Sequence, residues 1–269
     1  MINKEMLYGK EFRMSLTSMI LKKAAPVPHP EEFSRFLFIG PHPDDIEIGA
    51  GATAAKLAAM GKDVSFLVCL DGRFGLENAP KGTTPDQLAE IRKKETLAGA
   101  EKLGVKNVRF LGLSDGGLYD VNDLYDGIAR AIGEAQPDIV FAPDPLAESE
   151  CHADHLNVGE AVRRAAFFAP FEEIMNAHGA KSADVKAVAF YMTARPNRFV
   201  KTSGFTQIQR DALLCHASQF PKDSESYKSV DTYLKLRAAD FGMRSLKGSA
   251  EGFRVLGRTQ MHCLPEAGL

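Results

Sequence analysis

The chain has 269 residues, 45% of them hydrophobic, which is enough to bury one sizeable core. Its 33 Lys and Arg nearly balance 35 Asp and Glu, and the formal net charge of −2 argues against a nucleic-acid partner held by bulk electrostatics. Residues 1–23 carry charges throughout, so they contain neither a signal-peptide core nor a membrane span. We therefore expect a cytoplasmic protein without a membrane partner.

The chain begins with a segment, residues 5–23, that has the pattern of an amphipathic helix. Apolar runs and helical patterns then alternate. Strands are predicted at residues 35–40, 64–70, 108–111, 139–142 and 187–191, and helices at 46–60, 85–103, 124–135 and 157–168. This order requires a mostly parallel sheet with helices on both faces, which is a Rossmann-like, three-layer α/β fold.

The pattern becomes less regular after residue 168. Helices are predicted at 205–218 and 227–241, and strands at 198–200 and 253–256. We expect this C-terminal third to cover the mouth of the site. Because no linker rich in Gly, Ser or Pro interrupts the chain, we expect one domain over residues 1–269, with residues 1–34 as an N-terminal helical extension.

The first predicted strand ends in a turn that is dense in ionisable side chains. Residues 41–47 read PHPDDIE, and an Ala- and Gly-rich helix follows at once. Pro41 and Pro43 hold His42 on a stiff, extended segment. Ligands bind at the carboxyl ends of strands in open α/β sheets, so this turn is a candidate for metal or acid–base chemistry. An alternative interpretation is that Asp44 or Asp45 only caps the helix.

A second cluster, CHADH at residues 151–155, follows the predicted strand at 139–142. Imidazole and carboxylate groups bind first-row metals, and a catalytic zinc commonly takes three protein ligands and leaves one position open. His42, Asp45 and His155 would make such a site. In isolation, His152 and His155 could equally be ordinary polar residues at the start of a helix.

These segments together resemble the LmbE/PIG-L family of metal-dependent N-deacetylases. Residues 41–47, with Gly49 and Gly51, resemble the family signature, and residues 152–155 resemble its His-x-Asp-His motif. Further similar segments lie at residues 70–72, 91–95, 113–116, 215–220 and 250–255. Segments 142–145, 194–197 and 261–265 look closest to the diacetylchitobiose deacetylases of archaea. One departure is Ala153, where many members have Pro, which supplies no ligand.

The resemblance implies an enzyme that removes the acetyl group from N-acetylglucosamine or diacetylchitobiose, with zinc or another divalent metal as cofactor. Asp44, beside the ligand Asp45, is the expected general base. A protonated His152 would stabilise the oxyanion or protonate the leaving amine. Asp154 would orient a metal-bound histidine by accepting its second ring N–H. Glu47 could do the same, or could favour the positive end of the helix dipole.

For the amidosugar substrate, Arg92 and Asp115 are the strongest candidates through the family motifs, because charged groups make strong hydrogen bonds with sugar hydroxyls. Asp71 either contacts the sugar or only begins an Asp-Gly turn. His262 is expected to reach an active site, across a subunit boundary in a homo-oligomer. As bare residues, Arg92 and Asp115 would be ordinary surface or loop charges.

Three other functions compete with this one. The spacing of Gly49 and Gly51 invites a dinucleotide-binding interpretation, but Ala54 occupies the third glycine position and acids surround the turn. A non-catalytic protein could use the same ligands to hold a structural metal or a sugar. Within the enzyme class, the substrate could be another glucosamine conjugate, such as a thiol–sugar precursor or a glycolipid head group.

Overall fold

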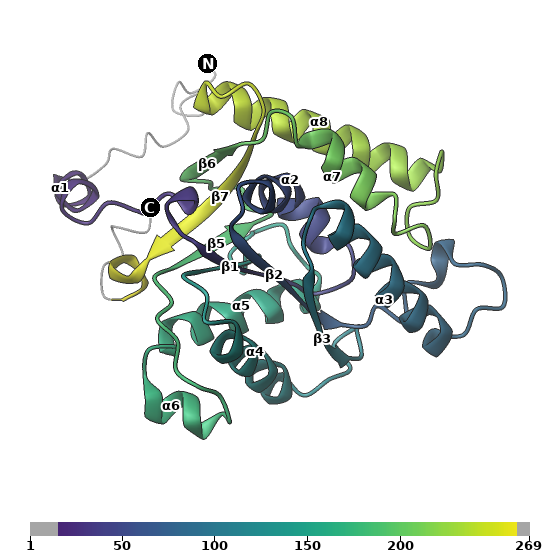
Figure 1. Ribbon diagram of the computed structural model, residues 1–269, viewed down its shortest axis with the longest axis horizontal. Helices are drawn as coiled ribbons and strands as arrows, with labels where there is room; N and C mark the ends of the chain where they lie inside the picture. The colour runs from purple at the N-terminus through teal and green to yellow at the C-terminus, as the bar shows by residue number, and fades with distance from the viewer. Residues whose placement is uncertain (1–15, 263–269) are drawn as a thin grey trace, which may run out of the picture.

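A computed structural model describes residues 16–262 and contains one seven-stranded sheet (Figure 1). The strand order is β3-β2-β1-β4-β5-β7-β6. The strands are β1 (Arg35–Gly40), β2 (Asp63–Leu70), β3 (Asn107–Leu113), β4 (Ile139–Pro143), β5 (Ala187–Tyr191), β6 (Arg198–Lys201) and β7 (Ala250–Gly257). β1 to β5 pair in parallel, whereas β7 pairs antiparallel with β5 and β6. The expected mostly parallel sheet is confirmed.

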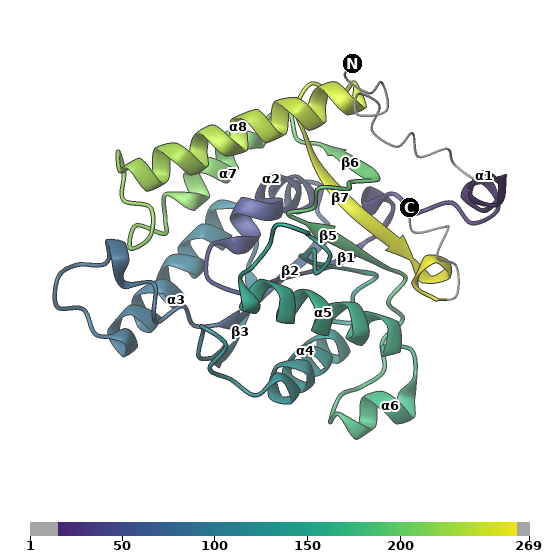
Figure 2. The same ribbon diagram turned by 180° about the vertical axis from the view of Figure 1, so that it is seen from behind.

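Helices cover both faces of this sheet. The helices of the described residues are α1 (Leu16–Ala24), which lies away from the sheet in Figures 1 and 2, α2 (Asp45–Ala59), α3 (Pro85–Lys102), α4 (Val121–Ala135), α5 (Ala153–Phe168), α6 (Glu172–Ala177), α7 (Thr206–Leu213) and α8 (Glu225–Ser245). Short 3-10 turns are η2 (Pro30–Glu32), η3 (Leu76–Asn78) and η4 (Arg258–Met261). Figures 1 and 2 show α4, α5 and α6 on one side of the sheet and α2, α7 and α8 on the other. The three-layer α/β fold is therefore confirmed.

The strand order reverses between β1 and β4. β2 and β3 extend the sheet on one side of β1, and β4 and β5 extend it on the other. β1 and β4 pair directly, with Phe36 opposite Ile139 and Phe38 opposite Phe141. The two helices that follow these strands leave toward opposite faces, which opens a crevice at the carboxyl ends of the strands.

β1 and β4 are buried on both faces, as their nearly continuous apolar sequences require. On the α2 side, the ring of Phe38 stacks on Phe141 with centroids 4.2 Å apart, and Phe253 of β7 meets Phe141 edge-on at 5.1 Å. On the α5 side, Leu37 and Val140 belong to a second apolar cluster. The two strands that precede the ionisable clusters are thus fixed in the core.

Several boundaries differ from the sequence prediction. The helix expected from residue 157 begins at Ala153, because Nδ1 of His152 accepts the N–H of Asp154 as an N-cap. Of the helix expected at 5–23, the part from Leu16 is described as α1, and the rest lies outside the described residues. The short helix α6 was not predicted. The division into one domain with an N-terminal extension stays a prediction.

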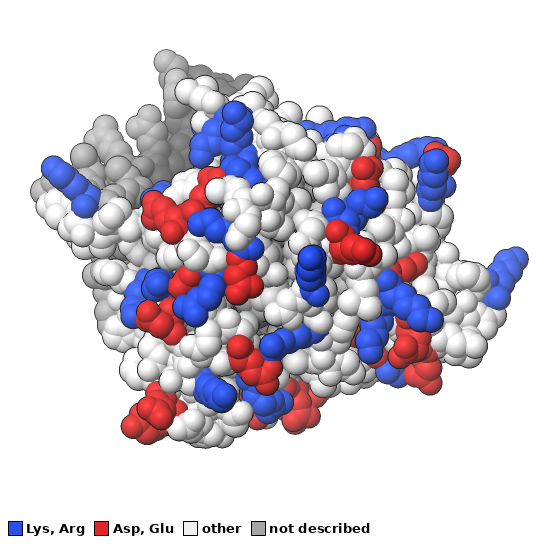
Figure 3. Space-filling view, in the orientation of Figure 1, with Lys and Arg blue, Asp and Glu red and all other residues white. Residues whose placement is uncertain are grey.

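Charges of both signs are interspersed over the face shown in Figure 3. Lys and Arg side chains lie beside Asp and Glu side chains across this face, and none of it is dominated by one sign. Within residues 16–262, no helix is both long enough and apolar enough to cross a membrane.

The glycines of α2 allow close packing of this helix. A Cβ at Gly49 would lie 2.7 Å from Cε2 of the buried Tyr191 and closer still to its Cδ2. Tyr191 is itself fixed, because its hydroxyl donates a 2.8 Å hydrogen bond to the carbonyl of Ile39. The close approach of Tyr191 therefore explains why residue 49 is a glycine. The glycine spacing no longer indicates a dinucleotide-binding turn.

We predict that Gly49→Ala lowers the free energy of unfolding by about 1–3 kcal/mol, because the ring of Tyr191 cannot move away without losing its hydrogen bond. Gly51→Ala is the matched control in the same helix. Its Cβ would lie 3.1 Å from the flexible Cγ of Gln209, so this change should cost less. Urea unfolding of both variants is the measurement, and equal stabilities would contradict the packing argument.

Candidate active site

His42 and Asp45 form a compact pair directly after β1. His42 lies in the turn, and Asp45 is the first residue of α2. Nδ1 of His42 is 3.1 Å from Oδ2 of Asp45, and the same oxygen accepts the backbone N–H of His42 at 2.8 Å. The turn therefore positions both side chains through local bonds, and both are buried.

His155 joins this pair from the first turn of α5, which follows β4. Its Nε2 lies 3.4 Å from Oδ1 of Asp45. The candidate ligand atoms of His42, Asp45 and His155 all lie within 4.8 Å of one another. Two imidazole nitrogens and one carboxylate oxygen fit a divalent metal such as zinc with a position left open. The direct pairing of β1 with β4 is what brings them together.

Asp154 supports His42 from the opposite side of the imidazole ring. Its Oδ2 accepts the Nε2–H of His42 at 2.9 Å. The carboxylate is fully buried and also accepts the backbone N–H groups of Gly116 and Gly117, at 2.7 and 2.9 Å. Burial works against the charged form, but these bonds outweigh it and hold the pKa of Asp154 well below its usual range. A fixed anion thus orients the ring, which is the geometry of the predicted role.

The carboxylates hold positive charge on both histidines. Burial alone would lower the pKa of His42, but hydrogen bonds with Asp154 and Asp45 raise it to about 10. Burial is likewise outweighed at His155, where Asp45 and Glu150 raise the pKa to about 9. A metal ion can bind His42 and His155 only where it displaces protons from their ring nitrogens. We therefore expect metal binding to weaken as the pH falls.

Asp44 is not part of the ligand group, and its backbone conformation is strained. Its φ of 105° is in a region that residues other than glycine rarely adopt. Although Asp44 occupies the N-cap position of α2, its side chain makes no capping hydrogen bond. Its Oδ2 instead accepts a 2.9 Å hydrogen bond from Nη2 of Arg92. The interpretation of Asp44 as a simple helix cap is therefore wrong.

The environment of Asp44 suits a group that exchanges protons near neutral pH. Burial raises the pKa of Asp44 to about 6, while Arg92 acts in the opposite direction. Arg92 is buried and also donates to the carbonyl oxygens of Pro43 (2.6 Å) and Gly72 (3.0 Å). Its nitrogens Nη1 and Nη2 thus hold Asp44 and its turn in place, and its Nε has no hydrogen-bond partner among residues 16–262.

A cavity of about 360 Å³ opens onto these groups. It is lined by His42, Asp44, Phe74, Gly75, Arg92, Asp115, Gly116, His152, His155 and Gln219. His152 is exposed, with its ring stacked on His155 at 4.8 Å. Its Nδ1 accepts the N–H of Asp154, which leaves Nε2 as the proton-bearing nitrogen. Asp115 is buried, and its carboxylate accepts the N–H of Phe74 at 3.3 Å.

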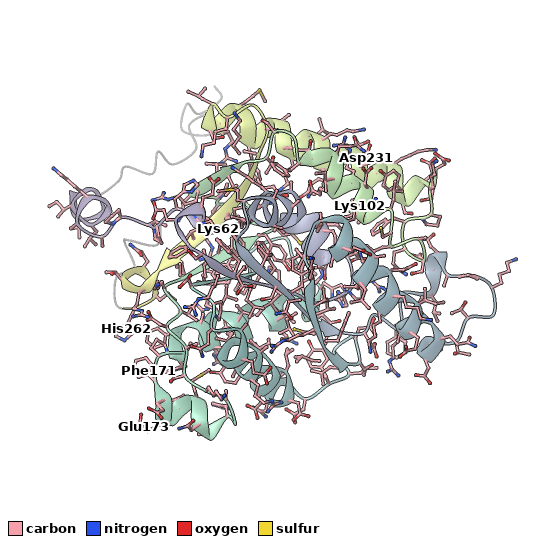
Figure 4. All side chains as sticks on the ribbon, viewed as in Figure 1. Lys62, Lys102, Phe171, Glu173, Asp231 and His262 are labelled. Carbon is pink, nitrogen blue, oxygen red and sulfur yellow. The ribbon has the colours of Figure 1, made fainter. Side chains whose placement is uncertain are left out.

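Two residues predicted to contact the substrate lie outside this cavity. Asp71 is held by Arg73, whose Nε and Nη2 donate to it at 2.8 and 2.6 Å, and it lines a separate cavity. His262 follows β7, which runs antiparallel to β5. It therefore lies near the amino ends of the parallel strands, at the opposite end of the sheet from the candidate site. There it stacks on Phe167, beside Phe171 in Figure 4. His262 therefore does not line the candidate site of its own chain, and a contact across a subunit boundary stays a prediction.

Sequence reasoning missed one carboxylate and misjudged another. Oε2 of Glu150 lies 2.9 Å from Nδ1 of His155, and nothing in the sequence marked this residue apart from its place in the loop before the motif. Glu47 does not touch the candidate ligands. It meets Nε2 of the buried His216 at 3.1 Å, so it ties α2 to the segment after α7.

The three-layer α/β fold and the group formed by His42, Asp45 and His155 are those of a metal-dependent hydrolase. The profile of the family described as GlcNAc-PI de-N-acetylase, PIG-L, matches residues 37–166. The diacetylchitobiose deacetylase of Thermococcus kodakarensis is 33% identical over 88% of this chain and 88% of its own. The chain therefore belongs to the PIG-L family of metal-dependent N-deacetylases.

Two further relatives extend the comparison. The structure of the N,N'-diacetylchitobiose deacetylase from Pyrococcus horikoshii, in complex with its inhibitor MPG, covers 92% of this chain and 95% of its own at 28% identity, with a TM-score of 0.83. A 1D-myo-inositol 2-acetamido-2-deoxy-alpha-D-glucopyranoside deacetylase of Kineococcus radiotolerans is 32% identical over 62% of this chain and 54% of its own. The resemblance found in the sequence is confirmed.

We predict that His155→Ala abolishes most divalent-metal binding, because it removes the one ligand that α5 contributes to the group. Elemental analysis of the purified protein is the measurement. His178→Ala is a control, since His178 pairs with Asp126 on the α4–α6 side of the sheet. Unchanged metal content in His155→Ala would contradict the ligand assignment.

Proposed function

We propose that this chain hydrolyses the N-acetyl amide of a small N-acetylglucosamine derivative, with zinc bound by His42, Asp45 and His155. The observation that carries this proposal is the position of Asp44. It adjoins a ligand in the sequence, yet its side chain stays outside the ligand group and lines the same cavity. An additional ionisable acid beside a three-ligand group is what a hydrolase needs and a purely structural metal site does not.

Amide hydrolysis needs a stronger nucleophile than water and a way to stabilise the developing oxyanion. A bound zinc ion supplies Lewis acidity for both. Asp44 accepts the proton of the attacking water as general base. Arg92 keeps its carboxylate aimed into the cavity through the 2.9 Å hydrogen bond.

His152 is the second group that acts on the amide. It is exposed on the rim of the cavity, and its Nδ1 is engaged by the N–H of Asp154. The Nε2–H of this neutral ring can therefore donate a hydrogen bond to the oxyanion, whereas giving a proton to the leaving amine would require the protonated ring. Burial and the nearby charges of His42 and His155 lower the pKa of His152, which favours the neutral ring and hence the hydrogen bond from Nε2 to the oxyanion.

The substrate class follows from the cavity and from the relatives. A volume of about 360 Å³ lies in the range of small-ligand pockets. Asp115 and Arg92 place a carboxylate and a guanidinium on its wall, where sugar hydroxyls would meet charged partners. The relative that matches 88% of the chain carries the name diacetylchitobiose deacetylase. We therefore propose N-acetylglucosamine and diacetylchitobiose as the substrates.

A second candidate substrate is another glucosamine conjugate. The relative from Kineococcus is named for an inositol conjugate of N-acetylglucosamine. The same zinc ligands and the same base would serve that reaction, because the scissile amide does not change. A non-catalytic metal or sugar sensor is the weaker alternative, since it gives no use to the strained backbone of Asp44.

We predict that Asp44→Asn retains its metal but loses about 10²–10⁴-fold in kcat, because an amide cannot accept the proton of water. In the parent enzyme, kcat/KM should fall as the pH drops through about 6, where Asp44 takes up a proton. The pH–rate profile and metal content are the measurements. Near-normal turnover in Asp44→Asn would contradict the role of this residue.

The substrate assignment is tested with a panel of N-acetylated sugars, in which the free amine is detected after incubation with the zinc-loaded protein. We expect hydrolysis of N-acetylglucosamine or diacetylchitobiose, and impaired turnover with full metal content in Asp115→Ala. If the protein ignored both sugars but cleaved an acetylated inositol or thiol conjugate, the chemistry would stand and the substrate would be the second candidate.

A further inference from the structure

The loop between β4 and α5, residues 144–152, carries a carboxylate with two separate bonds to the candidate active site. Oε2 of Glu150 lies 2.9 Å from Nδ1 of His155. Oε1 of the same side chain accepts the backbone N–H of His152 at 2.8 Å. One carboxylate therefore links a metal-ligand candidate to the backbone of the exposed histidine on the rim.

The first bond decides which nitrogen of His155 is free for a metal. A carboxylate can only accept a hydrogen bond from Nδ1, so Nδ1 carries a hydrogen, and in the neutral imidazole that binds a metal the unprotonated nitrogen is Nε2. Nε2 is the atom that lies 3.4 Å from Oδ1 of Asp45. The tautomer that Glu150 selects is thus the one that points its lone pair at the ligand group.

The arrangement repeats on His155 what Asp154 does on His42. Each imidazole has one nitrogen directed at the group and the other nitrogen hydrogen-bonded to a carboxylate, both at 2.9 Å. Asp154 belongs to the recognised His-x-Asp-His motif, whereas Glu150 lies outside it. Such partners of metal-bound histidines fix the ring orientation and raise its basicity as a ligand.

The second bond fixes the loop itself. By accepting the N–H of His152, Glu150 closes the chain onto the first turn of α5, so the ring of His152 stacks on that of His155. Glu150 is only partly exposed, with 27% of its side chain accessible. Its neighbour Glu148 differs, since its side chain is 79% exposed and pairs with Arg195 away from the histidines.

We propose that Glu150 is a positioning residue of the metal site: it sets the tautomer and orientation of His155 for the metal and holds the loop that carries His152. This inference rests on the proposed function only in taking His155 as a metal ligand. It predicts a loss of metal affinity that is independent of any substrate.

The experiment measures the zinc dissociation constant of the metal-free protein by competition with a chromophoric chelator. Glu150→Ala should weaken zinc binding about 10–100-fold, the usual effect of removing a partner of a metal-bound histidine. Glu150→Gln should lie between Glu150→Ala and the parent, because its amide oxygen can accept only one of the two hydrogen bonds. Glu148→Ala is the matched control in the same loop and should bind zinc as the parent does.

A spectroscopic readout separates orientation of the ring from general loosening of the loop. In the zinc-loaded, ¹⁵N-labelled parent, the Nδ1–H proton of His155 should give a resonance protected from solvent exchange. This resonance should disappear in Glu150→Ala and persist in Glu148→Ala.

Parent-like zinc affinity in Glu150→Ala would overturn the inference and leave the proposed function intact. If Glu150→Ala showed no cooperative thermal transition, Glu150→Gln would decide, and a parent-like affinity in that variant would overturn the inference. Failure of the parent to bind zinc would instead overturn the metal assignment in the proposed function.

Discussion

The structure depends first on the direct parallel pairing of β1 with β4. Only this pairing places the turn after β1, which carries His42 and Asp45, beside the start of α5, which carries His155. More than one hundred residues separate these groups in the sequence. The pairing is stable because both strands are buried on both faces and because Phe38 stacks on Phe141. The hydrophobic core thus sets the distances among the polar groups.

The less regular C-terminal part of the chain also acts on the site, through the loop after β4. Arg254 of β7 donates to both oxygens of the buried Asp144, at 2.9 and 2.5 Å, and its guanidinium lies over the ring of Phe190. This ion pair anchors the loop at its base, while Glu150 holds it at its other end. Without Arg254, Asp144 would be left as an uncompensated buried charge. The antiparallel strand β7, which carries Arg254, is therefore needed to fix the loop of residues 144–152.

Much of the fold and the ligand group could be predicted from the sequence because both depend on local patterns. Apolar runs marked β1 and β4, and His and Asp followed each of them. The contacts of Glu150 and of Arg73 with Asp71 depend on side-chain directions in loops, which no periodicity encodes. The position of His262 depends on the antiparallel direction of β7, and the sequence did not reveal that direction.

The adjacent acids Asp44 and Asp45 show how one short turn serves two purposes. In a regular helix start, both side chains would compete for the free N–H groups of the first turn. The positive φ of Asp44 instead turns its carboxylate toward Arg92, while Asp45 remains with His42. Such a conformation costs about 1–3 kcal/mol. The hydrogen bonds of Arg92 to Asp44, to the carbonyl of Pro43 and to that of Gly72 offset this cost, so the guanidinium that holds the carboxylate of Asp44 also stabilises the strained turn.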